Sequence, residues 1–198
     1  MRELLLATTN YHKLEEYRAI FSGLPFHFLS LHEIHLDLDV EETGTTFAEN
    51  AELKALTYAR ASGMLTLADD SGLEIDALGG APGIYSARFA GKETSYEERF
   101  RLLLEQLKGL TREQRTASFR CAIALVEPSG YHQTVEGTLE GQIADTPRGQ
   151  YGFGYDPIFF IPELGKTSAE LTPEHKNRIS HRGRAAQLAA ALLKNWPG

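Results

Sequence analysis

The sequence contains a single cysteine, Cys121, among its 198 residues. One thiol cannot form an intrachain disulfide, so a disulfide-stapled secreted domain is excluded and a reducing compartment is expected. Long apolar runs are missing too, because the apolar stretch nearest the N-terminus runs only from Leu4 to Ala7. That is far shorter than a signal peptide or a transmembrane helix requires. We therefore expect a cytoplasmic protein.

Positive charge is in the minority, with 20 Lys and Arg against 27 Asp and Glu and a net charge of −7. Broad nucleic-acid binding needs a basic surface, so we expect neither a nucleic-acid nor a membrane partner. A small anionic ligand in a local basic pocket remains compatible with this composition. The 42% hydrophobic and 24% charged fractions are those of a folded protein. The length predicts one domain over residues 1–198, with room for two lobes.

The stretch Leu65 to Gly80 contains two adjacent acids, Asp69 and Asp70, between two apolar segments. Its pattern predicts a strand, a sharp acidic turn through Ser71-Gly72, and a second strand. Neighbouring carboxylates repel one another unless a cation, solvent or hydrogen bonds separate them. The pair therefore indicates a Mg²⁺ or catalytic site. A solvated turn is the alternative, because Asp, Ser and Gly are ordinary turn residues.

The N-terminal pattern predicts a buried strand over Arg2 to Ala7, a polar turn Thr8-Thr9-Asn10, and a helix capped by Asn10. The free N–H groups and the dipole of such a helix make an anion site. Lys13 lies in the first turn, where a cation opposes the dipole. A bound anion would explain that placement; a solvent-exposed lysine is the alternative.

A second helix is predicted from the capping sequence at Thr46 to a glycine stop at Gly63. On it Asn50 and Lys54 lie four residues apart and share a face. These two side chains are functional only if the fold turns that face toward the paired aspartates. Otherwise they are surface residues.

The middle of the chain reads as structural. Ser95 to Leu110 predicts an amphipathic helix, and two long strands, Arg115 to Glu127 and Tyr131 to Ile143, are joined by a Pro-Ser-Gly turn. Apolar residues alternate along the first long strand and place Cys121 on its buried face. We interpret this cysteine as a small core residue rather than a catalytic thiol.

An aromatic loop, Gln150 to Pro162, follows. Its Gly-x-Gly is not a dinucleotide fingerprint, because Pro157 stands where the third glycine belongs. Aromatic side chains beside glycines can stack on a nucleotide base, and Phe153 is the candidate. The alternative is ordinary entry into a core strand over Ile158 to Ile161.

The C-terminal part concentrates hydrogen-bond donors ahead of a helix that Ser180 is expected to cap. Lys176, His181 and Arg182 surround the start of that helix. Positive charge at a helix N-terminus is unfavourable without an anionic or carbonyl-rich partner. These donors therefore predict a polar ligand.

Taken together, seven motifs closely resemble the inosine triphosphate pyrophosphatase family, in order and from the first strand to the last helix. They are Thr8-Thr9-Asn10 with Lys13, Glu41-Glu42-Thr43-Gly44, Glu49-Asn50 with Lys54, Ala68 to Leu73, Gly83 to Arg88, Phe153 to Pro157, and Ser180 to Gly183. The resemblance implies an α/β fold: an elongated mixed sheet with flanking helices, and two lobes around a central nucleotide cleft. It also implies a homodimer that hydrolyses ITP, dITP and XTP to the monophosphate and pyrophosphate.

The residue patterns supply a hypothetical mechanism for that activity. Glu42 and Asp70 hold Mg²⁺ on the triphosphate, and Asp70 or Asp69 deprotonates the attacking water. Lys13 and Lys54 neutralise the phosphates. The remaining residues expected to bind substrate share a place in one of the motifs above: Thr8, Thr9, Asn10, Ser71, Phe153, Gly154, Tyr155, Asp156, Lys176, His181 and Arg182.

Two rivals remain open. A pyrophosphatase for pyrimidine or methylated nucleotides would use the same phosphate residues with a different base pocket. A nucleotide-binding sensor without catalysis would show tight binding and slow turnover. A nucleic-acid-binding module is the least favoured alternative, because the composition is acidic.

Overall fold

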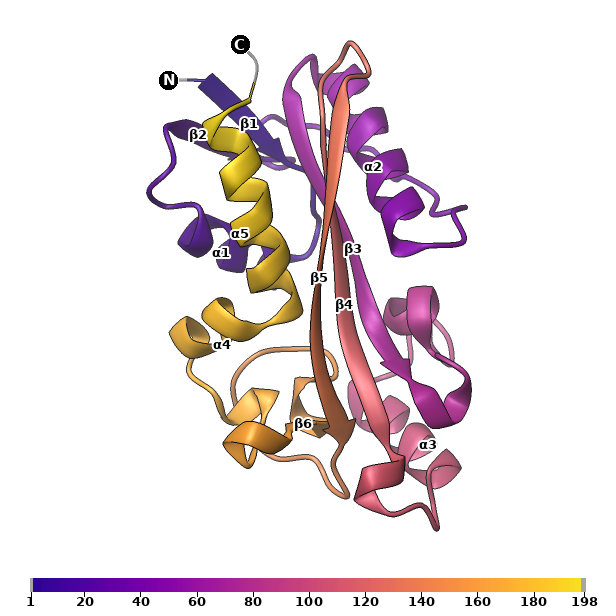
Figure 1. The fold of residues 1–198 in the computed structure, drawn as a ribbon. Coiled ribbons are helices and arrows are strands. Elements are labelled where there is room, and N and C mark those ends of the chain that lie inside the picture. Colours follow the sequence, from indigo (N-terminus) through magenta and orange to yellow (C-terminus); the bar gives the residue numbers. More distant parts are fainter. Residues whose placement is uncertain (1, 197–198) are drawn as a thin grey trace. The chain divides into compact units, whose positions relative to one another are not determined.

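The computed structural model describes residues 2–196 (Figure 1). The described chain forms two compact units. The first comprises the chain up to Asp70, residues 121–137 and the chain from His181 onward. The second comprises residues 71–120 and 138–180. Each unit has its own apolar core, so each is described by itself.

The strands form one seven-stranded mixed sheet in the order β2-β1-β3-β4-β5-β6-β7. β1 pairs in parallel with β2 and β3, whereas β6 pairs antiparallel with β5 and β7. The strand bounds are Arg2–Leu6 (β1), Phe26–Ser30 (β2), Leu65–Ile75 (β3), Thr116–Val126 (β4), His132–Ile143 (β5), Phe159–Ile161 (β6) and Lys166–Thr167 (β7). The predicted pair of long strands is confirmed as β4 and β5.

Five α-helices are assigned within residues 2–196. Their bounds are Tyr11–Ile20 (α1), Phe47–Ser62 (α2), Tyr96–Gln106 (α3), Pro173–Ile179 (α4) and His181–Lys194 (α5). Asn10 caps α1 by accepting from two backbone N–H groups, as predicted, and Thr46 and Gly63 bound α2. Short 3₁₀ segments include η2 (Gly83–Arg88) and η4 (Asp156–Ile158). The sequence did not predict α4.

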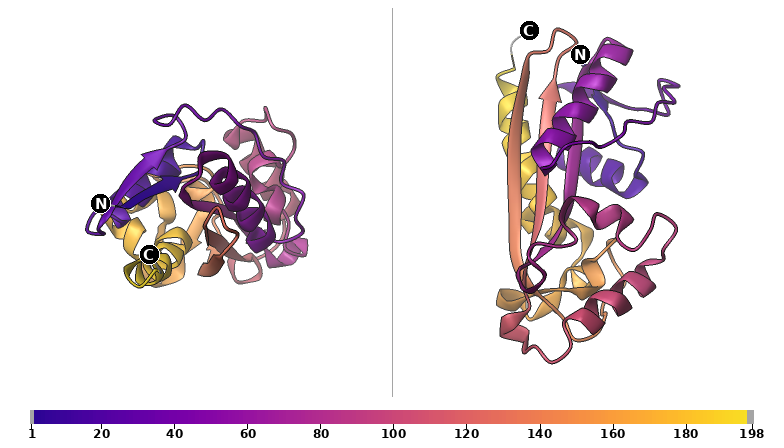
Figure 2. Two further views of the ribbon diagram at one scale, coloured as in Figure 1. Left: turned by 90° about the horizontal axis from the view of Figure 1, so that it is seen from above. Right: turned by 90° about the vertical axis from the view of Figure 1, so that its right-hand side faces the viewer.

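The core of the first unit packs α1 and α5 against the sheet. Fully buried side chains such as Leu4, Tyr17, Phe21 and Ile123 form it. Tyr17 and Phe21 stack with ring centroids 5.7 Å apart. Helix α2 lies on the other side of the long strands from α1 and α5 (Figure 1), and Figure 2 gives two further views of the same elements. The sheet of this unit therefore presents two separate faces to two sets of helices.

The core of the second unit is built around α3 and the far ends of the long strands. Leu73, Leu103 and Phe159 are fully buried there, and Phe119 stacks on Phe159 at 4.2 Å between centroids. Cys121, one residue beyond this unit's part of β4, is 1% exposed. The prediction that the cysteine is a core residue is confirmed.

The predicted acidic turn is wrong. Asp69 and Asp70 lie in the middle of one continuous strand, β3, which runs through Leu65–Ile75. Both aspartates are buried, and charged or amide side chains contact each of them. Polar turn residues extend a strand when the neighbouring elements satisfy their side chains, and local propensity does not contain that information.

None of the helices within residues 2–196 combines the length and the apolarity that crossing a membrane requires.

Candidate active site

Asp69 is the centre of a charged group on one face of the first unit's sheet. Its Oδ2 accepts a hydrogen bond from Lys13 Nζ at 2.9 Å and lies 3.7 Å from Arg182 Nε. Burial alone would raise the pKa of Asp69, but Lys13, Arg182 and Lys54 outweigh it and hold that pKa well below its usual range. These cations therefore favour the charged form of Asp69 and make it a weak base.

Asp70 points to the opposite face, because adjacent strand residues alternate. Its Oδ2 accepts from Asn50 Nδ2 at 3.0 Å, and its Oδ1 lies 3.8 Å from Lys54 Nζ. The predicted face of α2 is thus turned toward this aspartate. Lys54 also donates to Glu42 Oε1 at 2.6 Å. Two carboxylates and one ammonium group therefore meet at one place.

The pKa of Asp70 is shifted in the opposite direction to that of Asp69. Burial raises the pKa of Asp70, and although Lys54 opposes the shift, Glu42 adds to it. For Lys54, burial would lower the pKa, but Asp70, Asp69 and Glu42 together raise it. Asp70 is thus the better proton acceptor of the two aspartates, since a general base works best when its pKa approaches the working pH.

The turn after β1 provides the backbone donors of the group. Asn10 Oδ1 accepts from the N–H groups of His12 and Lys13 at 3.0 and 3.2 Å, and Asn10 N–H donates to Thr8 Oγ1 at 3.2 Å. Thr9 is exposed at the tip of the turn. Lys13 lies in the first turn of α1, and its side chain extends to Asp69. The anion beside this lysine is thus a side chain of the protein itself.

Two contacts of this group escaped the sequence reasoning. Arg182, at the start of α5 and 2% exposed, pairs with Glu16 Oε2 at 2.7 Å. Glu16 lies three residues after Lys13, so a face-by-face reading of α1 could have selected it. Cys121 Sγ lies 3.8 Å from Asp69 Oδ2 and 3.9 Å from Tyr17 OH. No sequence signal links residues 52 positions apart on different strands.

The donor set beside α2 fits a Mg²⁺ ion. Among residues 2–196 no cluster of three or more His, Cys, Asp or Glu side chains is arranged to hold a metal. Mg²⁺ does not need one, because one or two carboxylates commonly bind it together with water and substrate phosphate oxygens. Glu42 and Asp70 already converge on one cation, the ammonium group of Lys54. Their oxygens are the hard ligands that this ion prefers.

In the second unit, the residues of the aromatic loop form a second polar group. Asp156 Oδ2 accepts from Lys176 Nζ at 2.6 Å and from the backbone N–H of Phe153 at 2.8 Å. Lys176 Nζ also lies 4.7 Å from the centroid of the Phe153 ring. A Cβ on Gly152 would stand 2.1 Å from Asp156 Oδ2, and the φ of Gly152 is +74°. The loop therefore requires glycine here.

The other predicted residues of this unit have different surroundings. Tyr155 is 4% exposed and donates its hydroxyl to the carbonyl of Ser86 at 2.9 Å, so it belongs to the core. Gly154 has a φ of +64° and lies beside the Tyr96 ring. Ser71 is half-buried at the start of the unit. His181, which is 5% exposed, begins α5 in the first unit.

The fold and these side chains define an α/β protein with paired carboxylates among cations, and comparison with known proteins gives its family. The profile of the Ham1 family matches residues 4–192. A dITP/XTP pyrophosphatase from Geobacter sulfurreducens is 51% identical, with 100% of this chain and 99% of that protein covered. One from Bacillus subtilis is 48% identical, with 98% of each covered.

A solved structure agrees. A HAM1 protein from Coxiella burnetii superposes with a TM-score of 0.89 and 44% identity, covering 98% of this chain and 100% of that one. The chain belongs to the Ham1 family. The predicted resemblance and the mixed sheet with flanking helices are thereby confirmed.

Proposed function

We propose that this protein hydrolyses non-canonical purine nucleoside triphosphates, ITP, dITP and XTP, to the monophosphate and pyrophosphate. The observation that carries the proposal is the convergence of Glu42, Asp70 and Lys54, with Asn50 holding the aspartate. The relatives named dITP/XTP pyrophosphatase support the substrate class. A sensor without catalysis would not need a buried carboxylate whose pKa is raised.

Phosphate binding is assigned to the first unit. Lys13, Lys54 and the backbone N–H groups after Thr8 neutralise the triphosphate and the charge that grows on the leaving pyrophosphate. Asp69 holds Lys13 and Arg182 in place through ion pairs, and the same two cations keep its carboxylate charged. This role suits a carboxylate with a lowered pKa better than proton transfer does.

Metal binding is assigned to Glu42 and Asp70. When bound there, Mg²⁺ would withdraw negative charge from the phosphate oxygens. Water activation is assigned to Asp70, which accepts the proton of the water that attacks the α-phosphorus. Asn50 orients that carboxylate through its hydrogen bond to Oδ2.

Base selection is assigned to the aromatic loop and to the donor Lys176 in the second unit, while His181 and Arg182 of the first unit are proposed as further substrate donors. Phe153 stacks on the base, and Asp156 positions Lys176. Hypoxanthine and xanthine present a 6-oxo acceptor where adenine presents an amino donor. A site built to donate rejects adenine, because a buried donor would be left unpaired.

The test is a substrate panel of ITP, XTP, ATP, GTP and dTTP, with and without Mg²⁺, in which pyrophosphate and orthophosphate are assayed separately. We expect metal-dependent pyrophosphate release from ITP and XTP alone. Orthophosphate release, or equal rates across the panel, would contradict the proposal. Preference for dTTP would favour a pyrimidine nucleotide enzyme instead.

The first variant to make is Asp70→Asn. Its kcat for ITP should fall by about 10²–10⁴-fold, because a general base contributes that much. Asp76→Asn is the matched control, since Asp76 is exposed and directly follows the same strand. Near-normal turnover by a folded Asp70→Asn variant would refute the assignment.

Three further expectations belong to the proposal. The family resemblance implies a homodimer, which sedimentation would test. The single thiol is consistent with a cytoplasmic location, and residues 1–198 are proposed to act as one catalytic domain.

A further inference from the structure

Arg99, on α3 in the second unit, is a buried cation that pairs with no carboxylate within residues 2–196. It is 2% exposed, and its guanidinium donates to the carbonyls of Ser86, Gly91 and Lys92 at 3.5, 3.0 and 3.4 Å. Its Nε is buried without a hydrogen-bond partner in that same part of the chain. A buried charge without an ion pair is costly, so what it holds in place matters.

The rings beside Arg99 lead to the aromatic loop. The guanidinium lies 4.8 Å from the centroid of the Tyr96 ring. Tyr96 meets Tyr155 edge-to-face, with centroids 5.3 Å apart and an interplanar angle of 86°. Burial raises the pKa of Tyr155, so its hydroxyl stays protonated and can donate. It donates to the Ser86 carbonyl, the same oxygen that Arg99 approaches.

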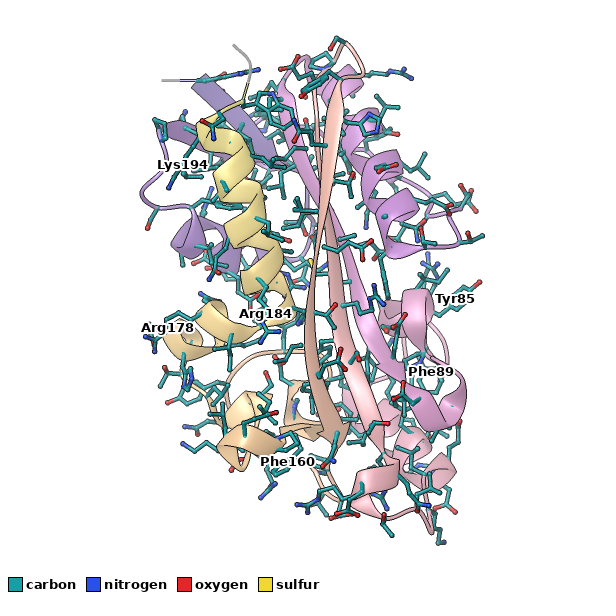
Figure 3. All side chains as sticks on the ribbon, viewed as in Figure 1. Tyr85, Phe89, Phe160, Arg178, Arg184 and Lys194 are labelled. Atoms are coloured by element: carbon teal, nitrogen blue, oxygen red, sulfur yellow. The ribbon has the colours of Figure 1, made fainter. Side chains whose placement is uncertain are left out.

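Ser86 joins this cluster to β3. Its Oγ accepts from the backbone N–H of Leu73 at 2.9 Å and donates to the carbonyl of Gly83 at 2.6 Å. Ser86 itself is 5% exposed and lies in η2, between Tyr85 and Phe89, which Figure 3 labels. Its carbonyl is therefore a fixed point to which both Arg99 and Tyr155 are tied.

Tyr155 belongs to the segment of residues 152–156, which we call the base-recognition loop. Tyr155 is bonded directly to Asp156, the acceptor for both Lys176 and the Phe153 N–H. Gly152 and Gly154 have φ angles of +74° and +64°, a region that glycine enters without strain. A loop with two such glycines has many conformations available unless something outside it restricts them. Tyr155 is the side chain of this loop that is anchored in the core.

We propose that Arg99 is a positioning residue for base recognition, acting through the Ser86 carbonyl and the Tyr96 and Tyr155 rings on the base-recognition loop. Arg99 touches neither base nor phosphate in this arrangement. It fixes the anchor of the loop, and thereby where Asp156 holds Lys176. The inference rests on the proposed function, since it assumes that this loop selects the base.

The test compares Tyr155→Phe, Arg99→Lys and Arg99→Met with the unaltered protein, measuring kcat and KM for ITP and for ATP. Tyr155→Phe removes only the hydroxyl, so the ratio of kcat/KM for ITP to that for ATP should fall about 2–10-fold, chiefly through KM for ITP. Arg99→Met should lower the ratio further. The ratio for Arg99→Lys should lie between those for Tyr155→Phe and Arg99→Met, because lysine keeps the positive charge but not the planar guanidinium group.

The matched control is Tyr58→Phe. Tyr58 is also 4% exposed and also donates its hydroxyl to a backbone carbonyl, that of Leu38 at 2.7 Å, but it lies in the first unit. Urea unfolding of all variants gives the stability change. We expect a similar loss of stability for the two Tyr→Phe changes and a loss of base selectivity for Tyr155→Phe alone.

The possible outcomes distinguish a failure of the inference about Arg99 from a failure of the proposed function. If the unaltered protein prefers ITP to ATP and Tyr155→Phe keeps that ratio while losing stability, Arg99 and Tyr155 are merely structural and the inference is wrong. An unaltered protein without base preference would overturn the proposed function first and this inference with it. If Arg99→Met does not fold, the Tyr155→Phe result still decides.

Discussion

Asp69 and Asp70 are bonded neighbours on β3, and their environments differ because a pleated strand sends them to opposite faces. Asp69 faces Lys13 and Arg182, which favour its charge. Asp70 faces a second carboxylate, Glu42, as well as a lysine. The charge of the first stabilises the fold, whereas the charge of the second costs stability.

Replacing each aspartate with asparagine should therefore change stability in opposite directions. A lowered folded-state pKa contributes stability above the unfolded value of about 3.9, so Asp69→Asn loses it at pH 7. We expect a loss toward the lower end of about 3–5 kcal/mol, because Arg182 keeps Glu16 as a partner and Lys13 is partly exposed to water. A raised pKa works the other way, so Asp70→Asn should be neutral or stabilising. Urea midpoints at pH 7 check both, and a loss from Asp70→Asn as large as from Asp69→Asn would contradict the assignment.

The thiol of Cys121 should be inert. Burial raises its pKa to about 12, and nearby Asp69 adds to the shift. Since the thiolate is the reactive form, Ellman's reagent should modify no thiol in the native protein and one in guanidinium chloride at pH 8. Rapid reaction of the native protein would show that this strand opens.

Among elements, β5 and the start of α5 approach each other closely in the first unit. A Cβ on Gly137 would lie 2.2 Å from the His181 carbonyl and 2.5 Å from the Ala185 nitrogen. Only a glycine permits this contact without moving the helix. The position of Arg182 at the head of α5 thus depends on a residue of a neighbouring strand.

Gly137→Ala should push α5 away and cost about 1–3 kcal/mol by overpacking. It should also lower kcat/KM for ITP, because Arg182 moves with the helix. Gly23→Ala is the control: a Cβ there meets nothing within 4 Å. The control should stay within about 0.5 kcal/mol. Equal urea midpoints for the two variants would show that the strand and helix separate easily.

Element boundaries with local signals were predictable from the sequence, and those set by distant partners were not. Asn10, Thr46 and Gly63 mark helix ends by their own backbone chemistry. The long strands follow from alternation. The interpretation of residues 69–72 as a turn failed, because Lys13, Asn50 and Lys54, which satisfy the aspartates, come from helices far away in the sequence.

For the whole molecule, the carboxylates predict how stability changes with pH. Hydrogen bonds lower the pKa of several partly exposed acids in the folded state, among them Glu33, Glu98, Glu127, Asp145 and Glu170. Asp69 shifts the same way, and Asp70 opposes them. The folded state therefore binds fewer acid protons than the unfolded chain. Their contribution is present above about pH 4.3 and lost as the pH falls further.

At alkaline pH the buried thiol of Cys121 has the opposite effect on stability, because its pKa is raised rather than lowered. The folded-state pKa of Cys121 is raised to about 12, so its contribution is full below the unfolded value of about 8.5 and lost as the pH rises. Urea midpoints should be highest between about pH 5 and 8 and fall on both sides. A midpoint that climbs steadily down to pH 3 would contradict this.

Many residues of the two polar groups were predictable from the sequence, whereas the unit to which each residue belongs was not. The shared face of Asn50 and Lys54 was predictable, because residues four apart on a helix lie on one face. Whether that face meets Asp70 was left open by the sequence, and the structure shows that it does. Lys176 and Arg182 were predicted to serve the same ligand; in the structure Arg182 contacts Asp69 in the first unit and Lys176 contacts Asp156 in the second. Lys176 and Arg182 are only six positions apart in the sequence, which gives no sign that they belong to different units.

The placement of both aspartates inside one strand also limits which insertions and deletions the gene can tolerate. Deleting one codon between Leu65 and Ala68 would shift the pleat by one, placing Asp70 where Asp69 stood and Ser71 opposite Asn50 and Lys54. A one-codon insertion would instead bring Ala68 to the face that holds Lys13. Point substitutions can change the side chains of this segment, but its length is set by the alternation.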